Sequence, residues 1–267
     1  MNSQWFRRFG EAGSGGVRLI CFPHAGGSAS VYVPLSRLLS SRPDSDVGGS
    51  DSGSVDVLAV QYPGRQDRRN ETPPAGIVEL AERIAEELGT ADGRPYAFFG
   101  HSMGALLAHE TARALVTRGA PAPVRLFLSA RGAPTPYPNR HDVLADDQEI
   151  LAAVRSLGGT GASVLADPEL VEMALPALRA DYRALASYRW SGGAPLDIPM
   201  TVLAGRDDPV VAVEDAARWR EFTRAGYELE VFPGGHFFLD QHLDAVAGLV
   251  LSGVHAHVQD AAVQGGR

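Results

Sequence analysis

The chain has 267 residues, with 24 Lys and Arg against 32 Asp and Glu, which gives a net charge of −8 at pH 7. This acidic balance argues against nucleic-acid binding, because neutralising phosphates requires clustered basic side chains. The single cysteine excludes an intramolecular disulfide and a Cys-rich zinc site. No apolar run approaches the ~20 residues of a membrane span, and the N-terminus lacks the apolar core of a signal peptide. We therefore expect a cytoplasmic globular protein that binds neither nucleic acid nor membrane.

Strand-like and helix-like segments alternate along most of the chain. Short apolar runs predict buried strands at residues 17–22, 55–61, 96–99, 124–129, 199–204 and 227–232. Segments of helical length lie among them, at about residues 29–40, 75–89, 103–118, 210–224 and 240–254. This order predicts an α/β fold of right-handed βαβ units, with a mostly parallel sheet covered by helices on both faces.

Two internal segments interrupt the alternation. Residues 41–54 contain almost no apolar side chains, which predicts a flexible surface loop. Residues 133–195 predict a Pro-containing loop followed by helices at about 146–156 and 168–188. A helical insertion is the simpler interpretation than a separate domain, and such insertions often cap active sites.

The remaining residues, 17–132 and 196–254, form one predicted α/β core. The core is preceded by residues 1–16, which are rich in glycine and serine and are expected to be a flexible N-terminus. Residues 255–267 end in Gly-Gly-Arg and are expected to be a frayed tail.

A G-x-S-x-G motif spans Gly100–Gly104, directly after the predicted strand 96–99 and directly before a predicted helix. This position is typical of a nucleophile elbow, in which Ser102 occupies a tight turn and the glycines allow close backbone approach. The start of the helix favours developing negative charge. The motif alone is weak, since an ordinary Gly-rich turn can match it; the strand–turn–helix context makes Ser102 the candidate nucleophile.

A nucleophilic serine requires a base and an orienting carboxylate, which follow it in the order Asp, His in this architecture. His236 follows a strand and a Gly-Gly turn and is the candidate base. Asp207 and Asp208 both follow the strand at 199–204. We favour Asp208, because the third position after Gly205 usually turns inward, whereas Asp207 would cap the next helix. These groups leave the same edge of the sheet as Ser102.

The small-residue loop at residues 22–27 follows the first predicted core strand and is the candidate oxyanion loop. Its backbone N–H at Ala25 would act together with that of Met103, the residue after the nucleophile. A phosphate-binding turn is the alternative, but neither G-x-G-x-x-G nor a Walker lysine is present. We expect His24 to line the pocket. No H-E-x-x-H or similar spacing occurs, so we predict no metal site.

The combined motifs resemble the type II thioesterases of polyketide and nonribosomal peptide synthases, a family with the α/β-hydrolase fold. The matching segments are residues 21–28 (CFPHAGGS), 61–65 (QYPGR), 99–105 (FGHSMGA), 129–134 (SARGAP), 179–182 (RADY), 205–209 (GRDDP) and 234–239 (GGHFFL). G-H-S-M-G alone occurs in many hydrolases, and the combination is far more specific. The acidic, Gly/Ser-rich stretch 41–54 is longer than usual for the family.

The resemblance implies a serine thioesterase that removes acyl groups from the phosphopantetheine arms of acyl or peptidyl carrier proteins, without a cofactor of its own. The insertion would form a lid. Arg65 and Arg131 are expected near the active edge, where they would meet the acidic carrier or the phosphate of the arm, or remain solvated surface residues. We expect a monomer.

Three other functions fit the same residues. A carboxylester hydrolase or lipase would use the same triad, and an acyltransferase would differ only in the nucleophile that releases the acyl group. A non-catalytic hydrolase-fold protein would bind a ligand only, although Ser102, Asp208 and His236 are all present.

Overall fold

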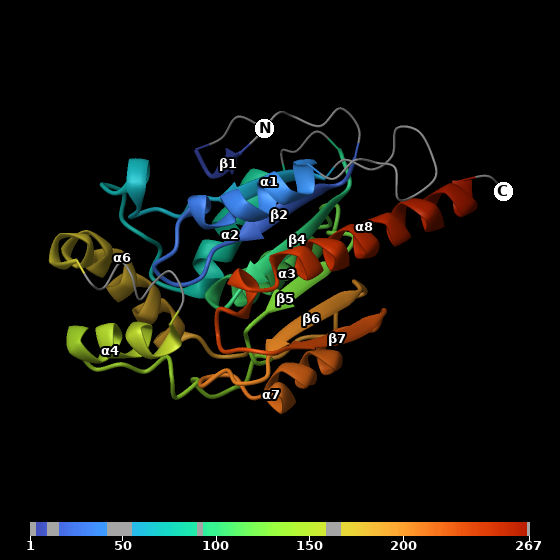
Figure 1. The fold of residues 1–267 in the computed structure, drawn as a ribbon. Helices are drawn as coiled ribbons and strands as arrows, with labels where there is room; N and C mark the ends of the chain where they lie inside the picture. Colours follow the sequence, from blue (N-terminus) through green and yellow to red (C-terminus); the bar gives the residue numbers. More distant parts are fainter. Residues whose placement is uncertain (1–3, 10–15, 42–54, 90–92, 159–166, 266–267) are drawn as a thin grey trace.

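Seven strands form one sheet, in the order β1-β3-β2-β4-β5-β6-β7 (Figure 1). The computed structural model describes residues 4–9, 16–41, 55–89, 93–158 and 167–265. The strands are β1 (Phe6–Arg8), β2 (Arg18–Phe22), β3 (Asp56–Val60), β4 (Tyr96–His101), β5 (Leu126–Ser129), β6 (Met200–Gly205) and β7 (Tyr227–Phe232). Neighbouring strands are parallel, except that β1 pairs with β3 antiparallel. The predicted α/β class with a mostly parallel sheet is confirmed.

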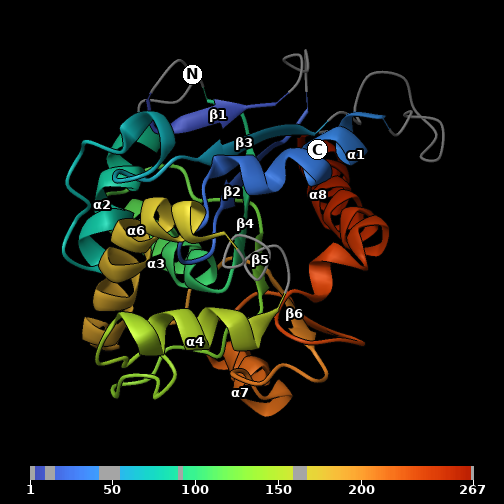
Figure 2. The ribbon, with the colours of Figure 1, turned by 60° about the vertical axis from the view of Figure 1, so that its left-hand side comes forward.

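Helices cover both faces of this sheet (Figure 2). One face carries α1 (Val33–Ser41) and α8 (Leu243–Gly265), and the other carries α2 (Ile77–Leu88) and α3 (Met103–Thr117). Shorter helical segments are η1 (Ala29–Tyr32), η3 (Gln66–Arg68), α7 (Val213–Ala217), η4 (Arg218–Phe222) and η5 (Phe238–Asp240). Strands covered on both faces bury all their side chains, which explains their continuous apolar runs.

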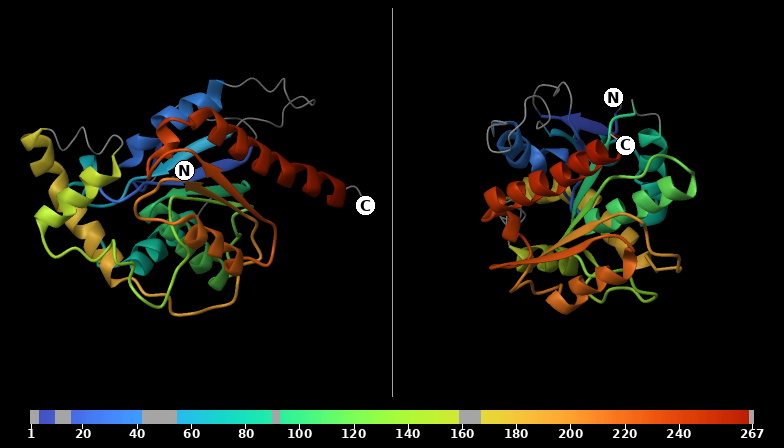
Figure 3. Two further views of the ribbon diagram at one scale, coloured as in Figure 1. Left: turned by 60° about the horizontal axis from the view of Figure 1, so that its bottom comes forward. Right: turned by 90° about the vertical axis from the view of Figure 1, so that its right-hand side faces the viewer.

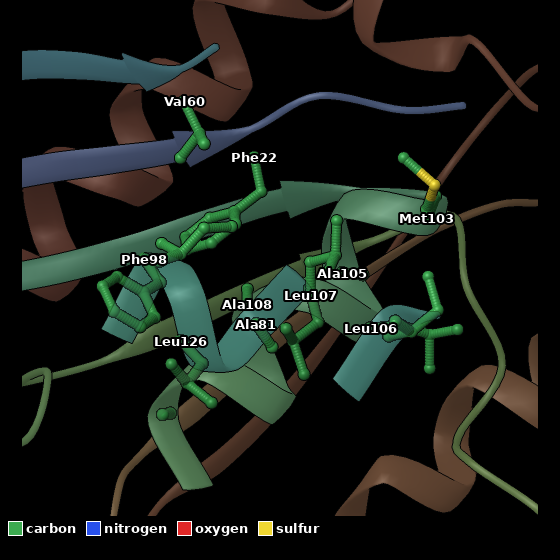
Figure 4. Packing of buried hydrophobic residues seen from close by; sticks show 14 of the residues in the cluster. Phe22, Val60, Ala81, Phe98, Met103, Ala105, Leu106, Leu107, Ala108 and Leu126 are labelled. Atoms are coloured by element: carbon green, nitrogen blue, oxygen red, sulfur yellow. The ribbon is translucent and has the colours of Figure 1, made fainter. Parts of the chain in front are cut away.

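The packing of α3 on the sheet positions the end of β4. Figure 4 shows Ala105 and Ala108 of α3 in the same buried cluster as the rings of Phe22 and Phe98, which come from β2 and β4. The two rings meet edge to face, with centroids 5.0 Å apart. Small residues on the buried side of α3 allow the helix to approach these aromatic side chains closely.

The N-terminal segment contains a strand that the sequence did not predict. Residues 1–16 were expected to be flexible, yet Phe6–Arg8 pair with β3 as an edge strand. Trp5 and Phe6 are buried, and the guanidinium of Arg68 lies 4.2 Å from the Trp5 ring centroid. The expectation is therefore wrong for this part, because two aromatic side chains outweigh the Gly/Ser-rich composition around them; residues 10–15 lie outside the described residues.

Three further expectations concern loops and edges. Residues 42–54 of the expected surface loop lie outside the described residues, and Ser41 ends α1. The expected frayed tail at 255–267 is wrong as far as Gly265, because α8 continues to that residue. Strand 227–232 is not buried as expected: β7 is one of the two outer strands of the sheet, and each of its side chains is half-buried or exposed. No helix in the described part of the chain is long and apolar enough to cross a bilayer.

The insertion contributes two helices, α4 (Asp147–Leu157) and α6 (Pro168–Ser187), which confirms the predicted pair. They lie together at one end of the sheet in Figure 1 and in the left view of Figure 3. Each begins at a capping aspartate: Asp146 accepts a hydrogen bond from the Glu149 N–H, and Asp167 accepts one from the Glu169 N–H. Such caps satisfy backbone donors that have no partner within the helix.

His109 of α3 gives the fold a predictable sensitivity to acid. Its ring is buried against Trp190, Trp219 and Phe222, and burial lowers its pKa to about 3, with a smaller effect from the Arg113 charge. Below pH ~6.5, His109 therefore binds a proton in the unfolded chain but remains uncharged in the folded protein. The free energy of unfolding is thus fully retained above this pH and falls by up to about 1.4 kcal/mol per pH unit below it.

His109→Leu is accordingly expected to reduce the loss of stability between pH 7 and pH 5 by about 2 kcal/mol. Urea unfolding of both proteins at the two pH values measures this difference. Val78→Ala, which changes an exposed residue of α2 that does not titrate, should leave the pH dependence unchanged. Equal losses for wild type and His109→Leu would contradict the prediction.

Candidate active site

Ser102 lies on a sharp turn between β4 and α3. Its backbone has φ 56° and ψ −117°, a left-handed conformation that costs a non-glycine residue about 1–3 kcal/mol. Glycine is required on both sides of it. A Cβ on Gly100 would lie 2.2 Å from the Gly104 carbonyl oxygen. The geometry is that of the predicted nucleophile elbow.

Gly104 brings the elbow against the loop that follows β2. A Cβ at this position would lie 1.9 Å from the Phe22 carbonyl oxygen and 2.8 Å from that of Pro23. The start of α3 therefore contacts the backbone that leads into residues 22–27, the candidate oxyanion loop. A side chain at position 104 would separate these two elements.

Gly104→Ala is expected to destabilise the fold by at least about 1–3 kcal/mol, because the methyl group meets backbone atoms and not a movable side chain. Hydrolytic activity should fall even where the variant remains folded. Thermal unfolding and turnover per folded protein measure the two effects. Gly226→Ala is the matched control, since a Cβ there meets no atom closer than 3.9 Å. A Gly104→Ala protein as stable and active as this control would contradict the prediction.

Ser102, His236 and Asp208 form a continuous chain of hydrogen bonds. His236 Nε2 lies 3.0 Å from Ser102 Oγ, and His236 Nδ1 lies 2.7 Å from Asp208 Oδ2. The three residues follow β4, β7 and β6, whose carboxyl ends share one edge of the sheet. The structure thus brings together all three predicted triad residues, and the imidazole can accept the serine proton while the carboxylate orients it.

Asp208, and not Asp207, contacts the imidazole. The other carboxylate oxygen of Asp208 accepts hydrogen bonds from the backbone N–H groups of Val210 and Val211, at 3.0 and 3.3 Å. These bonds fix the side chain. Asp207 instead accepts a bond from the Gly234 N–H at 3.3 Å, so its carboxylate supports the loop that carries His236.

The candidate oxyanion loop contains a turn closed by a 2.9 Å bond from the Gly27 N–H to the His24 carbonyl. Gly26 has φ +73°, a value that favours glycine. Ala25 lines the same cavity as Ser102. Met103 is the first residue of α3, so its N–H has no acceptor within the helix. Both backbone N–H groups remain our candidates for binding an oxyanion.

A mainly apolar cavity of about 540 Å³ extends from Ser102 and His236. Its wall includes Val31 and Leu35 on one side and Val246 of α8. Both insertion helices contribute to it, with Val154 and Leu157 from α4 and Ala174, Leu178 and Tyr182 from α6. The cavity can hold a flexible apolar group next to the hydroxyl of Ser102.

Two further histidines lie beside the triad and are held uncharged. His24 lines the cavity as predicted, and its pKa is lowered to about 4 by burial and by the nearby His236 and Arg65. Burial also lowers the pKa of His101 well below its usual value, and its Nδ1 lies 3.0 Å from Ser129 Oγ. At neutral pH neither ring adds a positive charge next to His236.

Arg65 and Arg131 do not lie at the surface. Their relative exposures are 5% and 8%. Arg65 forms a salt bridge with Asp181, and Arg131 forms a two-pronged one with Asp142 at 2.5 and 3.0 Å. The expectation of exposed arginines that contact a carrier protein or solvent is therefore wrong for both, because each charge is neutralised by a buried partner.

Asp181 is a site residue to which sequence reasoning gave no role. Its carboxylate accepts a 2.7 Å hydrogen bond from the Gly26 N–H of the candidate oxyanion loop. The signal was present in the sequence, since Asp181 lies between Leu178 and Tyr182 on the buried side of a helix. An acidic residue at such a position requires a partner.

No group of three or more potential metal-ligating side chains occurs among the described residues.

Comparison with known proteins identifies the family. The sequence model of the thioesterase domain matches residues 17–252. The chain belongs to the thioesterase family. This thioesterase is 45% identical over 253 residues to a probable cadicidin biosynthesis thioesterase of Streptomyces griseus, covering 95% of the chain and 66% of that relative, just under two thirds of its length. It is 43% identical to the thioesterase PikA5 of Streptomyces venezuelae, with 88% and 80% of the two chains covered.

The solved structures place this thioesterase in the same group. The type II thioesterase BorB of the borrelidin biosynthetic cluster superposes with a TM-score of 0.80 at 42% sequence identity, over 94% of this chain and 97% of BorB. The agreement covers almost the whole of both chains. The resemblance to type II thioesterases is therefore confirmed, and with it the α/β-hydrolase fold.

Proposed function

We propose that this thioesterase hydrolyses acyl groups from the phosphopantetheine arms of carrier proteins and thereby frees stalled or wrongly primed polyketide or nonribosomal peptide synthases. The observation that carries the proposal is the hydrogen-bonded chain from Ser102 through His236 to Asp208 beside an apolar cavity. The relatives are biosynthesis thioesterases, which supports a thioester as the substrate bond.

The first half-reaction transfers the acyl group to the enzyme. Ser102 Oγ attacks the thioester carbonyl while His236 Nε2 accepts the hydroxyl proton, and Asp208 stabilises the resulting imidazolium. The N–H groups of Ala25 and Met103 bind the oxyanion that forms. The carbon–sulfur bond then breaks, and His236 returns its proton to the departing sulfur, so that the carrier leaves as a free thiol.

The second half-reaction releases the acid. His236 removes a proton from water, whose oxygen attacks the acyl carbon, and the same oxyanion site stabilises the intermediate. The bond from Ser102 Oγ to the acyl carbon breaks, and His236 returns the proton to the serine. The cycle needs no cofactor of the enzyme, because the substrate itself carries the phosphopantetheine.

The acyl chain would lie in the apolar cavity, beneath the helices of the insertion. Val154 of α4 and Leu178 of α6 line it, so these helices are placed to act as a lid that shields the acyl chain from bulk solvent. The arginines predicted to meet the carrier are buried, and the carrier must therefore contact other residues.

Intact-protein mass spectrometry of a panel of acylated carrier proteins, before and after incubation with the enzyme, tests the proposal. Loss of the acyl mass, with the phosphopantetheine arm retained, is the expected result. A parallel comparison of kcat/KM for an acyl-carrier thioester and the matching oxyester tests the bond specificity. Preference for the oxyester by a large margin would indicate a carboxylester hydrolase instead, and transfer to an added alcohol or amine would indicate an acyltransferase.

A further inference from the structure

Two motif residues that the proposed reaction leaves unused meet inside the protein. Arg65 follows β3, and Asp181 lies on α6 of the insertion. Both are buried, with 5% and 4% exposure, and their side chains form a salt bridge. A buried ion pair stabilises a fold only weakly compared with apolar packing, so we look for a role of this pair in positioning its neighbours.

This ion pair forms hydrogen bonds with the backbone of two neighbouring residues, Gly26 and Gly27. Asp181 Oδ2 accepts the hydrogen bond from the Gly26 N–H at 2.7 Å. Arg65 Nε donates to the Gly27 carbonyl at 2.7 Å, while its Nη1 donates to the Pro63 carbonyl at 3.0 Å. The Gly26 N–H is thus fixed by the negative charge of Asp181, and the Gly27 carbonyl by the positive charge of Arg65. The two charges also neutralise each other.

The contact selects one form of the candidate oxyanion loop. Gly26 has a positive φ in a turn closed by the bond from Gly27 to His24, and glycine can readily leave this conformation. Rotation of the Ala25–Gly26 peptide would turn a carbonyl oxygen, instead of an N–H, toward the Asp181 carboxylate. The repulsion between these oxygens disfavours that rotation, and so the buried charge keeps the turn that contains the Ala25 N–H in one conformation.

The same residues connect the loop to α6. A Cβ on Gly26 would lie 2.5 Å from a methyl carbon of Leu178, which precedes Asp181 by one helical turn and lines the cavity. Helix α6 therefore both covers the acyl cavity and contacts the loop by packing and by charge. Movement of α6 away from the sheet would remove the acceptor of the Gly26 N–H.

We propose that the Arg65–Asp181 ion pair is a positioning device that holds the Ala25–Gly27 turn in its oxyanion-binding form and makes this form depend on the placement of α6. The inference rests on the proposed function, in which the Ala25 N–H stabilises the oxyanion. Asp181 and Arg65 act through the backbone and do not touch the reacting atoms. The oxyanion-binding form of the loop then requires α6 in the position that it has in this structure.

The test compares Asp181→Asn and Asp181→Ala with wild type, using a small acyl thioester as substrate. Loss of one oxyanion donor typically lowers kcat by about 10²–10³-fold. We expect a fall of about this size for Asp181→Ala and a smaller one for Asp181→Asn, whose amide oxygen can still accept from the Gly26 N–H. The KM should stay within about twofold, because the ground state does not use the oxyanion site.

A transition-state analogue adds a readout that a purely structural role would not change. Affinity for an acyl trifluoromethyl ketone should fall in parallel with kcat, whereas affinity for the product acid should not. In ¹⁵N-correlated spectra, the Gly26 amide resonance should move in both variants. This last measurement is independent of turnover, so it separates failure of the inference from failure of the proposed thioesterase reaction.

Two further variants keep the test decisive. Arg65→Met combined with Asp181→Leu removes both buried charges and should fold even if a single change does not, yet its kcat should be as low as that of Asp181→Ala. Asp147→Asn is the matched control, because it breaks an exposed ion pair between the same helix and α4, with Arg179, and leaves the Gly26 contact intact. It should retain kcat within about twofold.

Wild-type kcat in folded Asp181→Ala, or in the double variant, would overturn the inference. So would a rise in KM with kcat unchanged, or an unmoved Gly26 resonance. Activity that falls only in proportion to the folded fraction would assign the pair a stabilising role alone.

Discussion

Ser102→Ala is expected to lower kcat for acyl-carrier hydrolysis by about 10⁴-fold or more, while the protein remains folded. Removal of the nucleophile leaves only binding and the oxyanion site to accelerate the attack of water. Alanine keeps the Cβ and therefore the strained backbone at φ 56°, so the free energy of unfolding should change little. Mass spectrometry of the carrier and thermal unfolding measure the two quantities.

Labelling with a fluorophosphonate probe provides an independent check on this serine. Wild type should gain one label and Ser102→Ala none. Ser187→Ala changes an exposed serine at the end of α6 and should behave as wild type in both assays. Acyl release by Ser102→Ala at the wild-type rate would show that another group is the nucleophile.

The second large effect is expected at the carboxylate. Asp208→Asn should lower kcat by about 10³–10⁴-fold, because an amide can no longer hold the His236 tautomer that accepts the serine proton, nor stabilise the imidazolium. Asp207→Asn should lower kcat by no more than about tenfold, since its side chain accepts a hydrogen bond from the Gly234 N–H and does not contact the imidazole through the bond that Asp208 makes. Steady-state kinetics on one acyl-carrier substrate compares the two.

The two substitutions serve as controls for each other, because they remove the same charge from adjacent residues of one loop. The opposite order of effects would assign the orienting role to Asp207. Similar losses in both variants would mean that the net charge of the loop, and not the 2.7 Å contact with His236 Nδ1, determines activity.

The triad geometry could be predicted because each of its members is determined locally. Ser102 is marked by two glycines that the elbow requires, and His236 and Asp208 each follow a strand of a parallel sheet. Parallel strands direct their carboxyl ends to one edge, so local motifs far apart in sequence meet there without knowledge of the packing. The choice of Asp208 over Asp207 followed from the same turn geometry.

The pairing of buried charges could not be predicted in this way. Arg65 and Asp181 are 116 residues apart, and only the packing of the insertion on the core brings them together. Arginine in a loop is usually exposed, so the sequence predicts Arg65 and Arg131 near the active edge, in contact with the carrier or the phosphate of the arm, or solvated. Strand β1 escaped prediction for a related reason: its pairing depends on β3, and three residues carry no periodic signal.

The acyl cavity reaches into the packing of the core itself. Leu35 and Val246 form part of its wall and at the same time belong to the hydrophobic layer between the sheet and the helices α1 and α8. Under the proposed function, residues that also pack the core therefore limit the length of acyl chain that the cavity can hold. Smaller side chains at these positions would admit longer chains only at the expense of about 1–4 kcal/mol of core packing each. Under the proposed function, a substitution that widens the cavity for longer acyl chains therefore also lowers thermal stability.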